Sequence, residues 1–346
     1  MYEKTKGMIA KLMSAGTFSG VSVAFLTPQQ KEFFCWGQAQ IWPTPEPLRP
    51  EMLFDVASLT KVVGTTTVIL QLMEQGQLDI DRPLHYYYTK FSEQRLTIRH
   101  LLTHTGDIQG YIKNRDQLTA EELKQAYLGL TAGPQLGKKV VYTDTGTILL
   151  GFLLEELFNK DVTQVLTEQV LEPLGMKESC FLPQQVQCCV PTEFHPTRGL
   201  IRGQTHDPKA FILQRHAGNA GLFTNSYDLS KFVSMYLNQG STPCGQFLKA
   251  KTIQTVLQDQ TPTKNGGRSL GWDLKYFGKD QRPLLYHTGY TGTFLLMDVK
   301  VQEGFIFLSN RVHPKDQRVE YLKKRDLLIQ QYLKEKSSMV NEMSRL

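Results

Sequence analysis

Cysteine is scarce in this chain of 346 residues: there are five, and they form no Cys-x-x-Cys motif and no spacing typical of metal ligands. Two of them, Cys188 and Cys189, are adjacent. An odd number of cysteines that includes a vicinal pair is easier to explain as free thiols in a reducing compartment than as disulfides. A small scaffold held together by disulfides is therefore excluded.

Long hydrophobic runs are also absent: no apolar segment approaches the roughly 20 residues that a membrane-spanning helix needs. Residues 1–6 are charged, but no apolar segment of a signal peptide follows, since residues 21–26 are too few and Thr27-Pro28 ends them. The sequence as it stands predicts a soluble protein of the cytoplasm without a membrane span. A chain that had lost its leader before export would look the same.

No strong excess of one charge is present, because 39 Lys and Arg against 33 Asp and Glu leave a formal net charge of +6. The densest cationic run, Lys323-Lys324-Arg325, lies in a helical pattern without interleaved aromatic residues. Such a run is typical of a solvated helix face rather than of a nucleic-acid site, so we expect no nucleic-acid partner. With 40% hydrophobic residues, the chain can bury a sizeable globular core.

Hydrophobic periodicity divides the chain into three stretches. The first holds a helix at 1–14, strands at 21–26 and 32–36, and a long helix at 58–75. The middle stretch is mostly helical, with helices at 97–103, 120–130, 145–158, 161–171 and 227–238. The last holds strands at 271–277, 293–299 and 304–308 and a helix at about 316–334. This order predicts a layered α/β domain that is interrupted by a helical one.

Ser58 and Lys61 open the long helix with the spacing Ser-x-x-Lys. Residues three apart lie on one helix face, and the helix N-terminus offers free N–H groups to a developing oxyanion. A serine hydroxyl is a weak nucleophile until a base takes its proton, which a neighbouring amine can do. The pattern alone is weak, because an N-cap serine beside an unrelated solvated lysine fits it as well.

Two further sites follow along the chain. Tyr142-Thr143-Asp144 lies just before the helix at 145–158 and can aim two side chains into one pocket, although Asp144 can equally be a plain N-cap. His287-Thr288-Gly289 comes directly before Tyr290 and the strand at 293–299. Its glycine lets a substrate backbone lie close to the strand edge, although a hairpin turn explains the glycine equally well.

Taken in this order, the three sites resemble the Ser-x-x-Lys, Tyr-x-Asn and Lys-Thr-Gly motifs of the serine β-lactamase and penicillin-binding-protein superfamily. Three further blocks resemble its class C branch and the related esterases and D-stereospecific peptidases. They are residues 54–57 (Phe-Asp-Val-Ala), 101–106 (Leu-Leu-Thr-His-Thr-Gly) and 218–223 (Gly-Asn-Ala-Gly-Leu-Phe). The resemblance extends from about residue 15 to about residue 335, and six ordered blocks make it specific.

The resemblance implies an antiparallel sheet flanked by helices, with an inserted all-helical domain. Residues 1–75 and 265–346 would form the α/β sheet domain, and residues 76–264 the mostly helical one. The active site would lie between the two domains.

The same resemblance implies a mechanism. Ser58 would attack a carbonyl and form an acyl-enzyme that water then hydrolyses, while Lys61 and Tyr142 share the proton transfers. The backbone N–H groups of Ser58 and Tyr290 would form the oxyanion hole. The residues expected to contact the substrate are Asp144, His287, Thr288, Gly289 and Tyr290. No metal and no organic cofactor is expected.

Two positions depart from the family pattern. Asp144 stands where Asn is most common, and a carboxylate beside Lys61 should raise the pKa of its ammonium. That weakens Lys61 as the base and favours Tyr142, whose phenolate a protonated Lys61 would stabilise. His287 replaces a lysine that commonly attracts a substrate carboxylate. We expect this histidine to be partly charged near neutral pH, so the attraction should be weaker and pH-dependent.

Other candidate residues fit simpler interpretations. His100 and His104, four residues apart, lack the glutamate of a His-Glu-x-x-His motif, so no metal site is expected. His206 and Asp207 are interpreted as a loop pair, since no nucleophile adjoins them in the sequence. Arg311, after the last strand, can either touch substrate or take part in a scaffold salt bridge.

The sequence therefore predicts a serine hydrolase that acts through an acyl-enzyme on a small ester, amide or D-peptide. A carboxylesterase or D-amino-acid peptide or amide hydrolase ranks first, and a β-lactamase or D-Ala-D-Ala carboxypeptidase second. The alternative of another class is a non-catalytic relative that binds cell-wall peptides or a partner protein. Retention of Ser58, Lys61 and Tyr142 together argues against it. The sequence leaves the substrate and the oligomeric state open.

Overall fold

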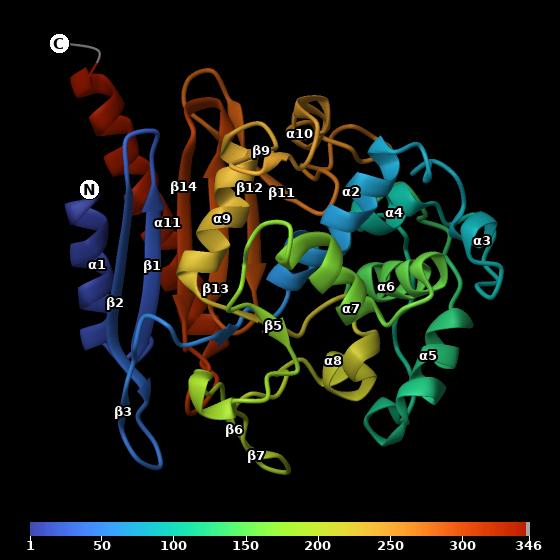
Figure 1. The fold of residues 1–346 in the computed structure, drawn as a ribbon, viewed down its shortest axis with the longest axis horizontal. Helices are drawn as coiled ribbons and strands as arrows, with labels where there is room; N and C mark the ends of the chain where they lie inside the picture. Colours follow the sequence, from blue (N-terminus) through green and yellow to red (C-terminus); the bar gives the residue numbers. More distant parts are fainter. Residues whose placement is uncertain (344–346) are drawn as a thin grey trace.

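A seven-stranded antiparallel sheet forms the centre of the fold (Figure 1). The computed structural model describes residues 1–343. Its strands run in the order β11 (Asp273–Phe277), β12 (Arg282–Gly289), β13 (Thr293–Asp298), β14 (Glu303–Ser309), β1 (Gly20–Leu26), β2 (Lys31–Gln40) and β3 (Glu46–Pro47). The two ends of the chain meet in this sheet, because β14 pairs with β1 and places Val21 opposite Ser309.

Helices cover both faces of the sheet. α1 (Glu3–Ser14) and α11 (Arg318–Met343) lie together on one face, and α9 (Ser226–Leu237) packs on the other (Figure 1). Side chains alternate along a strand. In β14, Phe305 therefore packs against Tyr332 of α11, whereas Ile306 joins the larger core on the opposite face. The sheet is a rigid support for the residues at its ends.

The segment between β3 and β11 is mostly helical. Besides α9, its α-helices are α2 (Thr66–Glu74), α3 (Leu84–Tyr87), α4 (Ile98–Leu102), α5 (Ala120–Leu128), α6 (Thr145–Phe158), α7 (Val162–Leu166), α8 (Pro208–Leu213) and α10 (Ala250–Val256). Two π-helical segments, η1 (Lys61–Thr65) and η3 (Thr167–Leu171), lie next to α2 and α7. Residues 145–154 of α6 are buried on all sides, as expected for a helix at the centre of a helical layer.

Short strands connect distant parts of this segment. β4 (Phe54–Asp55), β8 (Leu222–Thr224) and β5 (Cys180–Phe181) form a three-stranded sheet in which β8 is central. Two small hairpins are formed by β6 (Phe194–His195) with β7 (Gly199–Leu200), and by β9 (Ser241–Thr242) with β10 (Gly245–Gln246). The pairing of β4 with β8 brings the residues just before Ser58 next to the residues just after Asn219.

The predicted fold class is confirmed: an antiparallel sheet is flanked by helices, and a helical segment is inserted into it. β12 is not predicted from the periodicity, because Pro283 and Gly289 at its two ends are turn signals. The division into residues 1–75 with 265–346 and residues 76–264 stays a prediction. α9 lies within the second of these ranges and yet packs on the sheet.

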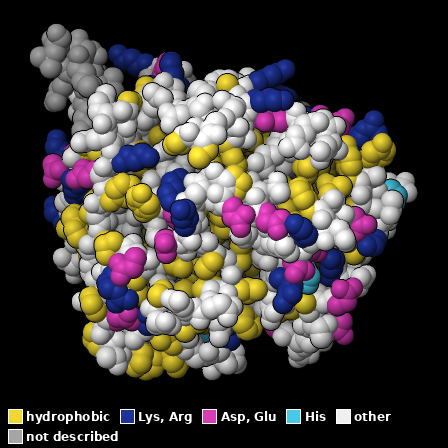
Figure 2. Space-filling model, viewed as in Figure 1, with side chains coloured by type: hydrophobic (Ala, Val, Ile, Leu, Met, Phe, Trp, Pro, Cys, Tyr) yellow, Lys and Arg dark blue, Asp and Glu magenta, His cyan; other side chains and the backbone are white. Residues whose placement is uncertain are grey.

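The surface carries both signs of charge. On the face drawn in Figure 2, Lys and Arg side chains are interspersed with Asp and Glu, and no stripe of one sign crosses it. Among the described residues, no helix combines the length and apolar character needed to cross a membrane. The cysteines are free thiols, as the sequence predicts, and burial raises the pKa of Cys189 to about 12.

Candidate active site

Ser58 lies at a sharp turn between a short strand and a helix. β4 ends at Asp55, and helical structure begins at Leu59. Ala57, just before Ser58, has a φ of +47°, in the left-handed region that residues with a side chain rarely adopt. The carboxylate of Asp55 holds this turn, because its Oδ1 accepts the Ala57 N–H at 2.8 Å. A strained residue fixed in this way is a frequent mark of a functional site.

Lys61 is buried next to Ser58, with 1% of its surface exposed. Its Nζ donates to Ser58 Oγ at 2.8 Å and to the carbonyl oxygen of Asn219 at 3.0 Å, and it pairs with Asp144 Oδ1 at 2.7 Å. The three protons of an ammonium group thus meet three acceptors. Lys61 is therefore not a solvated lysine, and the π-helical turn in which it lies is common at functional sites.

The charge on Lys61 follows from these neighbours. Burial acts to lower the pKa of Lys61, but Tyr142 and the Asp144 carboxylate outweigh it, so the pKa of Lys61 lies above its ordinary value. The raised pKa predicted from the sequence is confirmed. At neutral pH, Lys61 is an ammonium group that donates to Ser58 Oγ, so in this state it cannot accept the proton of Ser58.

Asp144 occupies the N-cap position of α6, but its side chain makes no capping hydrogen bond. Its two oxygens instead face two lysines, Lys61 at 2.7 Å and Lys209 at 2.8 Å. Burial acts to raise the pKa of Asp144, and the two cations overcome it and hold that pKa well below its usual range. Asp144 is therefore ionised at neutral pH. The interpretation of its side chain as a plain N-cap is wrong.

Tyr142 is placed between two cations, with 46% of its surface exposed. The ring centroid lies 5.5 Å from Lys61 Nζ and 5.4 Å from the guanidinium carbon of Arg268. Its ring also packs against the imidazole of His104, at 4.5 Å between centroids. Tyr142 therefore lies close to the ammonium group of Lys61 and to the guanidinium group of Arg268.

The end of β12 is pressed against the Ser58 turn. A Cβ added to Gly289 would lie 2.3 Å from the carbonyl oxygen of Val56, so only glycine fits there. Thr291 Oγ1 donates to the carbonyl oxygen of Asp55 at 2.7 Å, and Thr293 Oγ1 donates to that of Val56 at 3.2 Å. These contacts fix the chain around Tyr290 relative to Ser58. Gly289 is required by this close approach, and it also stands at the hairpin turn between β12 and β13, where the Gly292 N–H donates to its carbonyl oxygen at 3.2 Å.

His287 behaves differently from the sequence prediction. Its side chain lies within β12 and is 3% exposed. Burial, together with the charges of Arg268 and Lys61, lowers the pKa of His287 well below its ordinary value. The expectation of a partly charged imidazole near neutral pH is therefore wrong, because a buried ring beside two cations stays neutral. A neutral His287 brings no positive charge to a substrate anion, while its place as a substrate contact stays a prediction.

A pocket of about 290 Å³ opens beside Ser58. Its walls include Tyr142 and His287-Thr288-Gly289-Tyr290, so it brings most of the predicted site residues together. Asp144 is not among its lining residues and acts behind Lys61. Four arginines and one aspartate also line the pocket: Arg268, Arg311, Arg318, Arg325 and Asp273. Positive side chains therefore outnumber negative ones in the pocket lining.

Two of these arginines are engaged within the scaffold. Arg311 pairs with Asp316 and donates to the carbonyl oxygen of Tyr290, so the predicted scaffold salt bridge is confirmed. Arg311 also lines the pocket, and its contact with substrate stays a prediction. Arg325 pairs with Asp326 at 2.8 Å. Arg268 is 7% exposed and has one carboxylate within reach, Asp273, at 3.7 Å. Arg268 is the least neutralised of the buried cations here.

Sequence patterns missed Lys209, Arg268 and the role of Asn219. Asn219 lies in the quoted block 218–223, where its backbone carbonyl rather than its side chain reaches Lys61. Lys209 follows Asp207-Pro208 at the start of α8, which is a typical N-cap signal. His206 and Asp207 lie in a loop, as interpreted from the sequence, and each has another partner: His206 Nε2 faces Glu193 at 3.3 Å, and Asp207 pairs with Lys209 at 3.0 Å.

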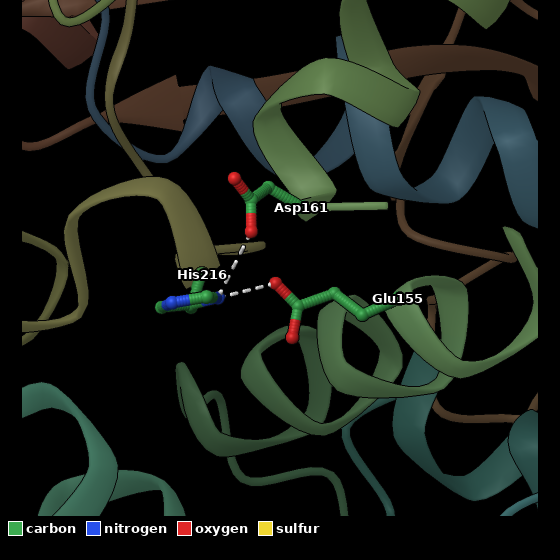
Figure 3. Close-up of side chains that lie close together, drawn as sticks. All are labelled: Glu155, Asp161 and His216. Atoms are coloured by element: carbon green, nitrogen blue, oxygen red, sulfur yellow. Dashed lines mark hydrogen bonds and ion pairs between the residues drawn. The ribbon is translucent and has the colours of Figure 1, made fainter. Parts of the chain in front are cut away.

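A separate cluster lies away from this pocket, at the C-terminal end of α6. Glu155, Asp161 and His216 converge there, with His216 Nδ1 2.6 Å from Glu155 and 3.9 Å from Asp161 (Figure 3). Both carboxylates already have cationic partners, since Lys124 lies 2.7 Å from Glu155 and Arg215 lies 3.3 Å from Asp161. These pairs account for the cluster as an ion-pair network that joins neighbouring helices.

Comparison with known proteins agrees with the serine-hydrolase geometry around Ser58. The β-lactamase family matches residues 5–329, and the chain therefore belongs to the β-lactamase family. An N-acetylmuramyl-L-alanine amidase of Bacillus subtilis is 27% identical over 318 residues, which cover 78% of this chain and 70% of that protein. The members of this family that resemble the chain are serine hydrolases, and so is this protein.

Solved structures share the fold at lower identity. A class C β-lactamase is 19% identical, with a TM-score of 0.73 over 92% of this chain and 94% of that one. A β-lactamase/D-alanine carboxypeptidase from Pseudomonas syringae is 17% identical, with a TM-score of 0.73 over 94% of this chain and 97% of that one. The predicted β-lactamase-like architecture is confirmed.

Proposed function

We propose that this serine hydrolase cleaves an amide or ester whose leaving group carries a free carboxylate, with a D-amino-acid peptide as the substrate class. The positive pocket beside Ser58 carries this proposal. Arg268 and Arg318 line it together with the nucleophile, and a substrate carboxylate would supply the charge that Asp273 alone does not balance. The names of relatives, an amidase and a D-alanine carboxypeptidase, support the same class.

The reaction we propose uses the geometry around Ser58 directly. Ser58 Oγ attacks the carbonyl carbon and passes its proton to the phenolate form of Tyr142, because Lys61 is already an ammonium group. The backbone N–H groups of Ser58 and Tyr290 donate hydrogen bonds to the developing oxyanion. Tyr142 returns the proton to the leaving amine, and water hydrolyses the acyl-enzyme by the reverse route.

The experiment compares an N-acylated D-Ala-D-Ala dipeptide with the same peptide as its C-terminal amide. The free acid is expected to react with a kcat/KM about 10- to 100-fold higher, which corresponds to one charge-assisted hydrogen bond. Arg268→Gln should remove most of that preference by raising KM for the acid, whereas Arg82→Gln, at an exposed arginine outside the pocket, should leave it intact.

Other outcomes point to other functions. Equal rates for acid and amide in the wild type and in Arg268→Gln would remove the carboxylate from the proposal and leave a carboxylesterase. Sustained turnover of benzylpenicillin without turnover of the dipeptide would favour a β-lactamase. If Ser58→Ala turned over nitrophenyl esters as fast as the wild type, the protein would not be a Ser58 hydrolase.

A further inference from the structure

Lys209 is a second lysine at the Asp144 carboxylate. It comes from the first turn of α8, and its Nζ lies 2.8 Å from Asp144 Oδ2 and 3.0 Å from Asp207 Oδ2. Its side chain is 18% exposed, so both ion pairs are largely shielded from water. Asp144 thus has one lysine on each oxygen, and only one of the two, Lys61, touches Ser58.

These contacts close into a ring. Lys61 pairs with Asp144, Asp144 with Lys209, and Lys209 with Asp207. The ring closes through Asn219, whose Nδ2 lies 3.3 Å from Asp207 Oδ1 and whose carbonyl oxygen accepts from Lys61. We call these five residues the charge ring. Two cations balance two anions in it, so removal of any charged member leaves an unbalanced charge in a shielded place.

We propose that Lys209 is a positioning residue of the Ser58 reaction, which holds Asp144 between two ammonium groups and sets the pH at which Ser58 becomes reactive. The inference rests on the proposed function, since it concerns the same serine. It assigns to Lys209 an effect through Asp144, without contact with the substrate. Lys209 does not line the pocket beside Ser58.

Electrostatics gives the direction of the effect. Burial acts to lower the pKa of Lys209, but Asp207 and Asp144 outweigh it and raise that pKa, so Lys209 carries a positive charge at neutral pH. A positive charge stabilises the deprotonated form of any group near it. Loss of Lys209 therefore removes a positive charge from the surroundings of Asp144 and Lys61, so loss of the Ser58 proton is less favoured at a given pH. The acid side of the pH–rate profile should move to higher pH.

Other charged groups around the ring do not replace Lys209. The titratable groups that interact with Asp144 include His104 and His287, and Tyr127 of α5 interacts with Lys209. Arg268 acts on the two histidines and Arg115 acts on Tyr127. Burial keeps the pKa of both histidines well below the ordinary value, so they stay neutral through the range measured. Burial also raises the pKa of Tyr127 to about 12.

The first test measures kcat/KM for a neutral nitrophenyl ester against pH in the wild type, Lys209→Met and Lys209→Arg. Lys209→Met is expected to move the acid limb up by about one pH unit while keeping most of the plateau at alkaline pH. Lys209→Arg, which keeps the charge, should restore the wild-type limb. Lys124→Met is the matched control, because Lys124 is 20% exposed and pairs with Glu155 outside the ring.

A purely structural role for Lys209 predicts another profile. It would lower kcat/KM by the same factor at every pH and leave the limb in place, and that result would overturn the inference. If Lys209→Met does not fold, Lys209→Gln is used in its place, and the same shift of the acid limb of the pH–rate profile is expected.

A second readout does not depend on turnover. In protein labelled with ¹³C-aspartate, the Asp144 carboxyl signal is assigned by its loss in Asp144→Asn and titrated with acid. Lys209→Met should raise the pKa of Asp144 by about one unit or more, because one of its two cations is gone. An unchanged Asp144 titration would overturn the inference. Absence of Ser58-dependent turnover in the wild type would instead reject the proposed function, so the two failures are distinguishable.

Discussion

Replacement of Lys61 by methionine is expected to lower kcat/KM for an activated ester by about 10³-fold or more, the range of a group that takes part in proton transfer. The ammonium of Lys61 is the direct partner of Ser58 Oγ at 2.8 Å. Methionine fills the same volume without a donor. Removal of one cation from the charge ring should lower stability, but Asp144 keeps its second cation, Lys209, at 2.8 Å, so the variant should still fold.

The matching change at Tyr142 decides which group takes the proton of Ser58. Tyr142→Phe keeps the ring contact with His104 and removes only the hydroxyl, so its structural cost is small. We expect it to slow formation of the acyl-enzyme by at least about 10²-fold, as measured by intact mass after acid quenching. Near-normal acylation in Tyr142→Phe, with acylation abolished in Lys61→Met, would assign the base to Lys61 and refute the role given to Tyr142.

The part of this site that could be predicted from the sequence consists of residues that lie close together in short motifs. Ser58 and Lys61 are one helical turn apart, so local geometry alone brings them together. The effect of Asp144 on the pKa of Lys61 could also be predicted, because the sign of an ion pair does not depend on details of packing. Both inferences need only the order of residues and one turn of helix.

The rest depends on contacts between distant segments. Lys209 reaches Asp144 from a segment 65 positions later, and nothing in its local pattern indicates the partner. The charge of His287 was mispredicted for a related reason: the ordinary pKa of histidine belongs to a solvated ring. In β12 the ring is buried beside Arg268 and Lys61, and burial decides its protonation.

The close contact between Gly218 and α6 provides the second test of how the site is held. A Cβ on Gly218 would lie 2.5 Å from the carbonyl oxygen of Thr147 and 2.9 Å from the Cα of Gly151. Both neighbours are backbone atoms of a buried helix, so they cannot move aside cheaply. Gly218→Ala should therefore cost roughly 1–3 kcal/mol of stability, as overpacking of a core does.

The same substitution should also affect the reaction, because Gly218 precedes Asn219, whose carbonyl oxygen holds Lys61 at 3.0 Å. A shift of about 1 Å in a positioning group can cost 10²-fold in rate, so we expect kcat/KM to fall by about that factor at a temperature where the variant is folded. Thermal unfolding and ester kinetics on the same sample measure both effects.

Gly7→Ala is the matched control, since Gly7 lies within α1 and a Cβ there meets nothing within 4 Å. It should raise stability by about 0.5–1 kcal/mol, the ordinary gain of alanine over glycine in a helix, and leave kcat/KM unchanged. If Gly218→Ala instead kept both its stability and its kcat/KM, the approach of the Asn219 segment to α6 would not be what holds Lys61 against Ser58. The ion pair with Asp144 would then be sufficient to place the ammonium group by itself.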